Sequence, residues 1–332
     1  MRIKAAMVIG MSLCTISMVF GSSVVTKREN QTASQNAFIK KRSSETLERL
    51  TPELLYSYLN FKFDSTSGNN FNRFHGHANQ YGIGGNYVWF KKKNVLTGLY
   101  IFNVDTYASS QFFVTGNNPT ALRQSIHNQT LLGHVLKSFN PNLFLDISGA
   151  YGINKQNYQM DTTLSNGVNL FGTAHSRNST WFASLAAIYS KSVKTFLITA
   201  NARVLYSSTN SGNYTFKFQD PFPPGKVAPQ RTNVTWIMEN LELDYKWKEG
   251  IVPFVNGGLI QVARFANDRQ IIITPVNGAL PQLSLNKDGF RVGGGVQLKY
   301  KSLYVRLEQK YYSAGGSYTN NLTLIKLKYK MS

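Results

Sequence analysis

The sequence has a single cysteine, Cys14, which lies inside the N-terminal apolar run. No disulfide can therefore form within the chain, and a domain of this length does not need one to bury a stable core. Beyond Phe20 no stretch approaches about 18 consecutive apolar residues, which excludes a bundle of membrane-spanning helices. Aromatic residues and glycine are plentiful instead, with 13% Phe, Trp and Tyr and 26 glycines. This composition is compatible with a single β-rich body.

Acidic residues are also scarce, since 16 Asp and Glu oppose 36 Lys and Arg, and the formal net charge is +20. An excess of positive charge of this size usually suggests that the protein binds nucleic acid. Here the cations do not form one patch, because many stand at expected tight turns and strand ends. We therefore expect contacts with anionic lipid head groups or periplasmic polyanions, and no nucleic-acid partner. The cations concerned are Lys91, Lys92, Lys93, Lys137, Lys191, Lys194, Lys246, Lys248, Lys299 and Lys301.

The N-terminal segment has the three parts of a secretory signal. Arg2 and Lys4 are basic, residues 5–20 are mostly apolar, and Gly21 begins a short run of small residues. We predict that residues 1–23 are a signal peptide that is removed after export.

The segment that follows, residues 24–56, has a different pattern. Leu47, Leu50, Leu54 and Tyr58 recur at helical spacing, and serines followed by Glu45 form a plausible helix start. We predict a short N-terminal helix here, either at the periplasmic mouth or in the lumen of the domain that follows.

Long segments with a period of two dominate the rest of the chain. In residues 196–206, apolar side chains alternate with Thr199, Asn201 and Arg203. Residues 325–331 alternate apolar side chains with lysines in the same way. This period indicates β-strands whose two faces meet different surroundings. A strand with three lysines on one face fits a closed barrel, which shows one face to lipid and the other to a wet lumen.

The connections between these segments alternate between short and long. Tight turns fall roughly every 50 residues, with longer polar loops between them, which is the pattern of outer-membrane barrels. We predict an all-β fold, a transmembrane antiparallel β-barrel of about 12 strands over residues 57–332. A large soluble β-sandwich or barrel is the alternative. The expected tight turns are residues 91–94, 140–142, 190–194, 248–250 and 300–302.

The inward face of the proposed barrel collects charged residues. They either brace a filled barrel or line a pore. Asp105 and Asp146 are expected to project inward from other strands. The lysines of the last strand are expected to face the lumen, where that strand pairs with the first around residues 59–63. The predicted lumen-lining ladder consists of Arg203, Glu242, Asp244, Arg291, Arg306, Glu308, Lys310, Lys326 and Lys328.

Enzymatic and metal sites have weak support in the sequence. His75 and His77 could share one face, but no third metal ligand is evident nearby. His175 and Ser179 lie close in sequence, but no residue that would orient the histidine can be named. We expect no enzymatic activity, no cofactor and no metal.

Glycine-rich hairpins carry a resemblance to a known family. Residues 81–87, YGIGGNY, and residues 97–100, TGLY, are similar to the first barrel hairpin of the autotransporter translocator domain. Gly293–Gly295 and Gly315–Gly316 resemble its later strands. The resemblance implies an outer-membrane location, passage or surface presentation as the function, and barrel-assembly machinery and lipopolysaccharide as partners. About 30 residues separate the signal from the expected first strand, so we expect a member without a passenger domain.

Two other functions are compatible with the sequence. A porin-like channel would prefer small anionic solutes, because Arg203, Arg291, Arg306 and the lysines at the periplasmic rim outweigh the inward acids. A surface adhesin or structural barrel would act through its outer loops, in particular residues 220–225 and 271–276.

Overall fold

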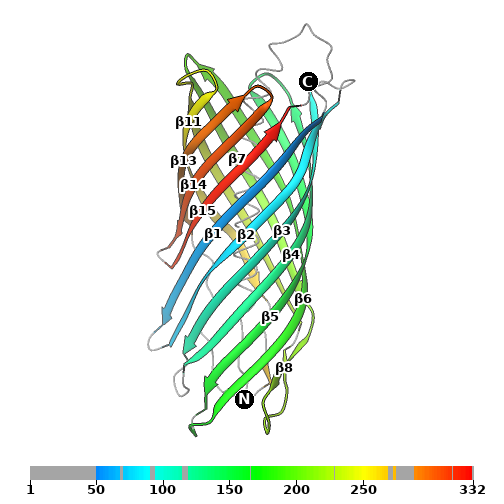
Figure 1. The fold of residues 1–332 in the computed structure, drawn as a ribbon, viewed down its shortest axis with the longest axis vertical. Coiled ribbons are helices and arrows are strands. Elements are labelled where there is room, and N and C mark those ends of the chain that lie inside the picture. The colour runs from blue at the N-terminus through cyan, green and yellow to red at the C-terminus, as the bar shows by residue number, and fades with distance from the viewer. Residues whose placement is uncertain are drawn as a thin grey trace.

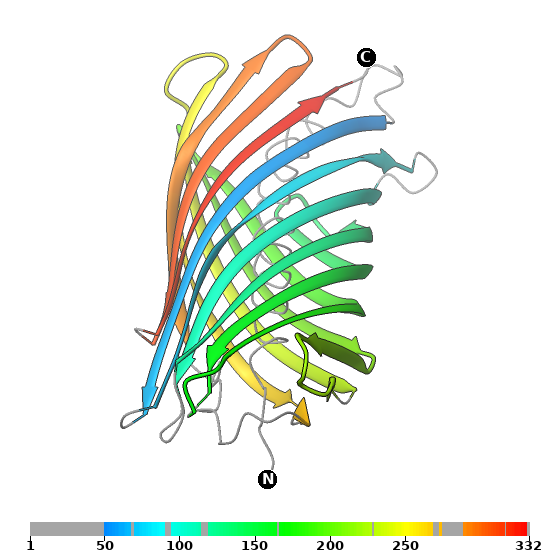
Figure 2. The same cartoon turned by 60° about the horizontal axis from the view of Figure 1, so that its bottom comes forward.

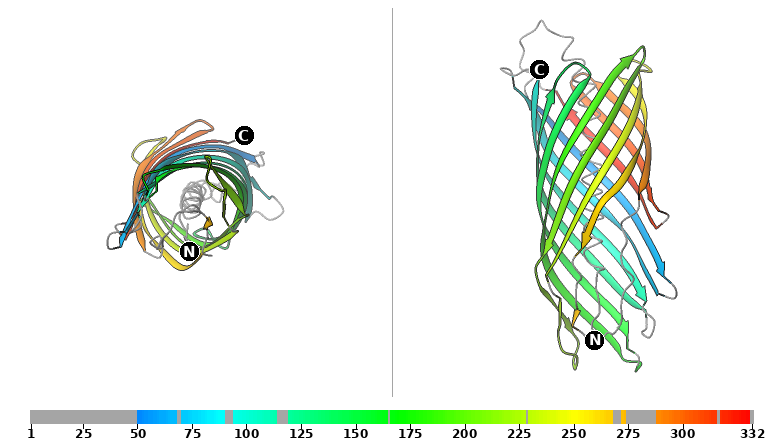
Figure 3. Two further views of the ribbon diagram at one scale, coloured as in Figure 1. Left: turned by 90° about the horizontal axis from the view of Figure 1, so that it is seen from below. Right: turned by 180° about the vertical axis from the view of Figure 1, so that it is seen from behind.

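The computed structural model describes residues 50–67, 70–89, 94–113, 119–164, 166–227, 229–267, 272–273, 288–315 and 317–330. Within them, twelve antiparallel strands form a closed barrel (Figure 1; Figure 3, left). β1 pairs with β15 and β6 pairs with β7, so each strand of the ring has a partner on both sides. The strands are β1 (Leu50–Ser67), β2 (Asn70–Val88), β3 (Val95–Phe113), β4 (Thr120–Ser138), β5 (Leu143–Thr163), β6 (Asn169–Val193), β7 (Phe196–Ser211), β10 (Gln230–Tyr245), β11 (Ile251–Asn267), β13 (Gly289–Tyr300), β14 (Leu303–Ala314) and β15 (Tyr318–Tyr329).

The predicted fold class and the strand count are confirmed. Tight turns join strands at or beside four of the expected positions, 140–142, 190–194, 248–250 and 300–302. They lie at the end of the barrel where β1 begins and β15 ends, the upper end of Figure 1. The second turn is shorter than expected and lies at residues 194–195, because β6 continues to Val193; residues 91–93 of the fifth expected turn lie outside the described residues. Lys194 and Lys301 adopt positive φ angles of 53° and 52° in two of these turns. In bacterial barrels the short turns and both chain ends lie on the periplasmic side. The upper end of Figure 1 is therefore the periplasmic end.

The start of the first strand differs from the prediction. β1 begins at Leu50, so the last part of the predicted helical segment 24–56 is strand. Its pairing explains this. Leu50 to Ser67 pairs along its whole length with β2, while the pairing with β15 begins at Glu53. Pro52 lacks a backbone N–H, and it precedes the first residue of β1 that pairs with β15, so no hydrogen bond to β15 is lost. The predicted signal peptide 1–23 and residues 24–49 lie outside the described residues.

The register at the seam also differs from the prediction. Lys326 lies opposite Leu55 and Lys328 lies opposite Glu53, whereas residues 59–63 of β1 face 318–322 of β15. The lysines do face inward, as predicted, but they meet the early part of β1. This shift follows directly from the earlier start of the strand.

The wall of the barrel is much taller on one side than on the other. β13, β14 and β15 have 12 residues each, whereas β2, β3 and β4 have 19 each, β5 has 21 and β6 has 25. A tilted strand needs about 9–11 residues to cross the bilayer. The lower ends of β2–β6 reach well below those of β13–β15 in Figures 1 and 2. From the strand lengths we infer that these lower ends extend beyond the membrane.

Short strands continue this tall wall at its outer end. β8 (Tyr214–Phe218) pairs with the beginning of β6, and β9 (Gly225–Val227) pairs with β8 and with β12 (Ile272–Ile273). Of the second loop segment considered as adhesive, 271–276, the structure describes Ile272 and Ile273, and these pair with Val227 and Lys226, directly after the first segment, 220–225. Tyr214 stacks on the buried Tyr158, with ring centroids 5.4 Å apart, and Phe216 packs beside it. Burial raises the pKa of the Tyr158 hydroxyl well above its ordinary value, so it remains neutral.

The outer face of the barrel carries an apolar band. Within this band the side chains that point outward are large and exposed, and they alternate with buried inward ones along each strand. No helix in the described part of the chain is long and apolar enough to cross a membrane. The band includes Ile83, Ile101, Leu131, Ile147, Leu185, Val204, Leu241, Val255, Val292 and Leu298.

Candidate functional site on the inward wall

The alternation places all nine residues of the predicted charge ladder on the inward face, where every one is buried. Successive side chains along a strand point to opposite faces of the sheet. Each of β7, β10, β13, β14 and β15 therefore turns its polar face toward the interior. The charged groups gather in two clusters, which we name after their central residues.

The Arg306 cluster joins β10, β11 and β14. The guanidinium of Arg306 donates to both carboxylate oxygens of Glu242, at 3.0 and 2.8 Å, and its Nε donates to Glu308 at 3.1 Å. Glu308 also accepts from Asn256 at 2.6 Å and pairs with Lys310 at 2.9 Å. A buried pair of this bidentate kind is rigid, because both planar groups are held in one orientation. Arg306 further lies 3.7 Å above the ring of Phe254.

The Glu53 cluster crosses the seam between β1 and β15. Glu53 pairs with Lys326 at 3.0 Å and accepts hydrogen bonds from Tyr100 at 3.0 Å and Asn86 at 2.8 Å. The chain of contacts continues from Asn86 to His134 at 2.9 Å, and from His134 to Asp146 at 2.9 Å. It therefore links the first five strands to the last one.

A glycine makes room for this cluster. Gly98 of β3 lies between His134 and Asn86, and a Cβ at this position would stand 2.2 Å from His134 Nε2. The glycine of the TGLY segment thus serves close side-chain packing inside the barrel. This close packing explains why a glycine stands at position 98 of the glycine-rich hairpin.

The remaining ladder residues lie on the same wall. Arg203 donates to Ser184 at 3.1 Å, and Asp244 accepts from Gln297 at 3.0 Å. Arg291 and Lys328 are buried, and Lys328 lies opposite Glu53 in the register. The structure thus brings the charged residues of β10, β14 and β15 together and places Arg203 and Arg291 beside them on the inward face.

One predicted inward residue was assigned to the wrong face. Asp105 points outward, where it meets His127 of β4 at 2.6 Å, because the inward residues of β3 at this level are Val104 and Thr106. Asp146 does point inward, as predicted, and is fully buried.

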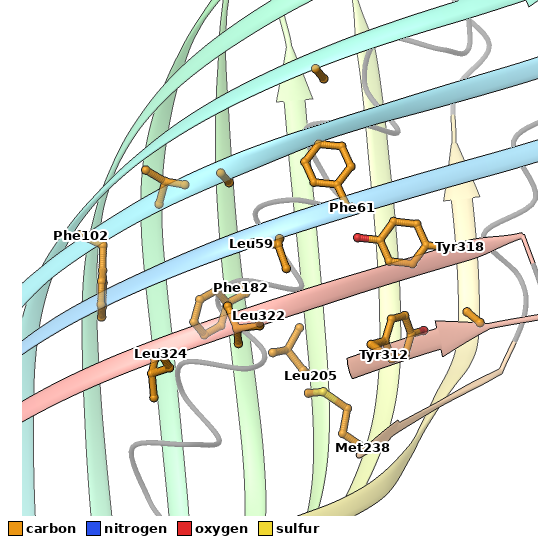
Figure 4. Close-up of a cluster of buried hydrophobic side chains, with 14 of the residues drawn as sticks. Leu59, Phe61, Phe102, Phe182, Leu205, Met238, Tyr312, Tyr318, Leu322 and Leu324 are labelled. Atoms are coloured by element: carbon orange, nitrogen blue, oxygen red, sulfur yellow. The ribbon is translucent and has the colours of Figure 1, made fainter. Parts of the chain in front are cut away.

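A second feature of the wall, the inward apolar belt, was not recognised in the sequence. Its side chains are buried and come from β1, β2, β3, β14 and β15, and from β6, β7 and β10 across the barrel (Figure 4). The alternation of Leu59, Phe61 and Phe63 was visible in the sequence, but the period alone does not say which face points inward. The belt comprises Leu59, Phe61, Phe63, Phe74, Phe102, Phe182, Leu205, Met238, Tyr312, Tyr318, Leu322 and Leu324.

The histidines considered for metal binding lie on the opposite face. His75 and His77 point outward from β2 and lie opposite Ser109 and Tyr107 of β3 in the register, with the rings of His77 and Tyr107 5.4 Å apart. In the described residues no group of three or more His, Cys, Asp or Glu side chains is placed to hold a metal ion.

A closed antiparallel barrel with an apolar outer band and a charged interior defines a bacterial outer-membrane barrel. A family model described as the autotransporter beta-domain matches residues 57–308. The chain belongs to this family.

Solved structures of the same class share the fold at low sequence identity. The translocator domain of autotransporter NalP from Neisseria meningitidis aligns with a TM-score of 0.64 and 10% identity, over 95% of this chain and 98% of that one. The beta domain of the Bordetella autotransporter Brka gives 0.56 and 12%, over 85% and 99%. The transport unit of AIDA-I from Escherichia coli gives 0.53 and 10%, over 91% and 97%. Curated protein sequences give no match.

Proposed function

We propose that this barrel carries a polypeptide segment across the outer membrane, for passage or for presentation at the cell surface. The observation that supports this most is the composition of the inward wall. Charged clusters and the inward apolar belt lie on the same strands, with Glu53 and Leu59 both on β1 and Lys326 and Leu322 both on β15. A polypeptide offers both polar and apolar groups to such a wall. A small ion would gain nothing from the aromatic part.

An epitope tag tests this proposal in cells. We expect a short tag inserted between residues 26 and 27 to be labelled by antibody on intact bacteria. A matched control carries the same tag in the β4–β5 turn, at residues 140–142, which lies at the periplasmic end. The control should be labelled only after the outer membrane is permeabilised. If the first tag also needs permeabilisation, the leading segment does not reach the surface and the proposal is wrong.

The porin-like alternative loses part of its support when buried charges are counted. Among the described residues, six basic and five acidic side chains are buried, because Glu53 and Asp146 join the acids of the predicted ladder. Nearly balanced charge gives little selectivity. We expect reversal potentials of an open barrel in a salt gradient to show only a weak anion preference. A strong preference for either ion would contradict this charge count.

A further inference from the structure

The outer wall of β1–β5 carries a polar field beyond the apolar band. Residues that are paired in the register lie side by side on neighbouring strands, so outward residues form rows that run across the strands. One row reads Leu54, Ile83, Ile101, Leu131 and Tyr151 and is aliphatic apart from the tyrosine. Two positions further along each strand, tyrosines and amides begin, as at Tyr56 and Tyr81, whose rings are 5.2 Å apart. The wall then becomes polar toward the outer end of the barrel.

Three consecutive rows make up this polar field. The rows continue onto β6, and they contain basic, amide and hydroxyl side chains with two tyrosines. Such a surface lies where the tall wall leaves the membrane, just beyond the band that meets the acyl chains. The rows are Tyr58, Asn79, Asp105, His127, Lys155 and Arg177; Asn60, His77, Tyr107, Ser125, Asn157 and His175; and Lys62, His75, Ser109, Arg123, Gln159 and Thr173.

Two adjoining hollows lie within the field. One has a volume of about 410 Å³ and is lined by residues that include His77, Tyr107 and Asn157. The other, of about 480 Å³, is lined by residues that include Lys62 and Arg73. Both share His75, Ser109 and Arg123 as lining residues, so they form one continuous groove across the strands.

Positive charge prevails in the field. Arg73 pairs with Asp64 at 3.1 Å, and His127 pairs with Asp105 at 2.6 Å, which uses two of the acids facing outward here. The third, Asp161, lies one row beyond Gln159 on β5. In the described part of the chain, Lys62, Arg123, Lys155 and Arg177 make no ion pair. They are exposed and remain available to a ligand.

We propose that this field binds a phosphorylated glycolipid of the outer leaflet, lipopolysaccharide. Its acyl chains would lie on the apolar rows, and its phosphate groups would meet Lys62, Arg123 and Lys155. The amide and hydroxyl side chains between these cations suit the sugar hydroxyls. Continuity with the lipid-facing band distinguishes a lipid from a soluble polyanion, because a bound lipid must contact both zones at once.

A triple variant tests the proposal. Lys62→Gln, Arg123→Gln and Lys155→Gln together remove three of the four unpaired cations without touching the interior. The control variant, Lys191→Gln, Lys194→Gln and Lys248→Gln, removes three exposed cations at the periplasmic end. Binding of purified lipopolysaccharide to each refolded protein in detergent is measured by native mass spectrometry, after gel mobility shows that each variant folds. We expect the first variant to bind on the order of tenfold more weakly and the control to bind as the wild type does.

Two further ligands identify what is recognised. Dephosphorylated lipopolysaccharide should bind the wild type weakly, and inorganic phosphate should not displace the intact lipid. Equal binding by the wild type and the first variant would overturn the proposal, as would an equal loss in the control variant. Full displacement by inorganic phosphate would show a simple anion site and would overturn it too.

Discussion

Replacing Arg306 with methionine is expected to lower the free energy of unfolding by about 3–5 kcal/mol, the usual cost of removing one partner from a buried ion pair. Glu242 would lose both of its hydrogen bonds to the guanidinium, and its carboxylate is fully buried. Glu308 would keep Lys310 and Asn256, so the damage should centre on Glu242. Urea unfolding of the barrel in lipid vesicles measures the effect.

Two further variants separate charge pairing from packing. The double variant Arg306→Met, Glu242→Gln should recover much of the loss, because the orphaned charge is removed as well. Arg73→Met breaks the exposed pair with Asp64 and should cost less than about 1 kcal/mol. If Arg306→Met costs no more than Arg73→Met, the Arg306 cluster does not brace the wall.

A single methyl group at Gly258 is expected to destabilise the barrel by about 1–3 kcal/mol or more, the range for overpacking. A Cβ at this position would lie 1.9 Å from the carbonyl oxygen of Glu239 on β10. Since that atom belongs to the backbone, the strands themselves must move apart. The fraction of folded protein, read from its gel mobility before and after heating, should fall for Gly258→Ala.

The adjacent glycine provides the control. At Gly257 the nearest atom to an added Cβ is 3.7 Å away, which is an ordinary contact. Gly257→Ala should therefore change the free energy of unfolding by no more than about 0.5 kcal/mol. Equal effects of the two substitutions would mean that strand propensity, and not contact with β10, decides the outcome.

The sequence predicted the barrel and much of the charged interior because these depend on a local pattern. In β14, Leu303, Val305 and Leu307 alternate with Arg306 and Glu308, and the structure keeps that division of faces. Lipid outside and polar groups inside leave such a pattern in any strand that crosses the membrane. The ladder residues followed from this pattern alone.

Glu53 could not be assigned in the same way. Its neighbours Leu50 and Leu54 have helical spacing and Pro52 precedes it, so local propensity favours a helix start. Its partners Tyr100 and Lys326 are distant in sequence, and only closure of the barrel brings β15 beside β1. Pairing with two strands outweighs the local preference.

The alternating pattern also could not predict which face of each strand points inward in the part of the tall wall that extends beyond the membrane. Phe61 and Phe63 point inward, whereas Lys62 points outward, the reverse of the division within the membrane. Beyond the bilayer the outer face meets water, and the inward face carries the buried side chains of the inward apolar belt. An alternating strand therefore keeps its period of two, but its apolar side chains point inward and its polar side chains point outward. The misplaced Asp105 lies in this same zone, and strand heights are needed to recognise it.

Single-channel recording in planar bilayers tests most directly whether the inward wall lines a route across the membrane. Refolded protein with and without residues 24–49 is compared, and the deletion leaves β1 intact because this strand begins at Leu50. We expect the shortened barrel to conduct ions in discrete steps. The full chain shows whether the leading segment closes the route. A shortened barrel that is folded, as its gel mobility can show, but never conducts would contradict the account.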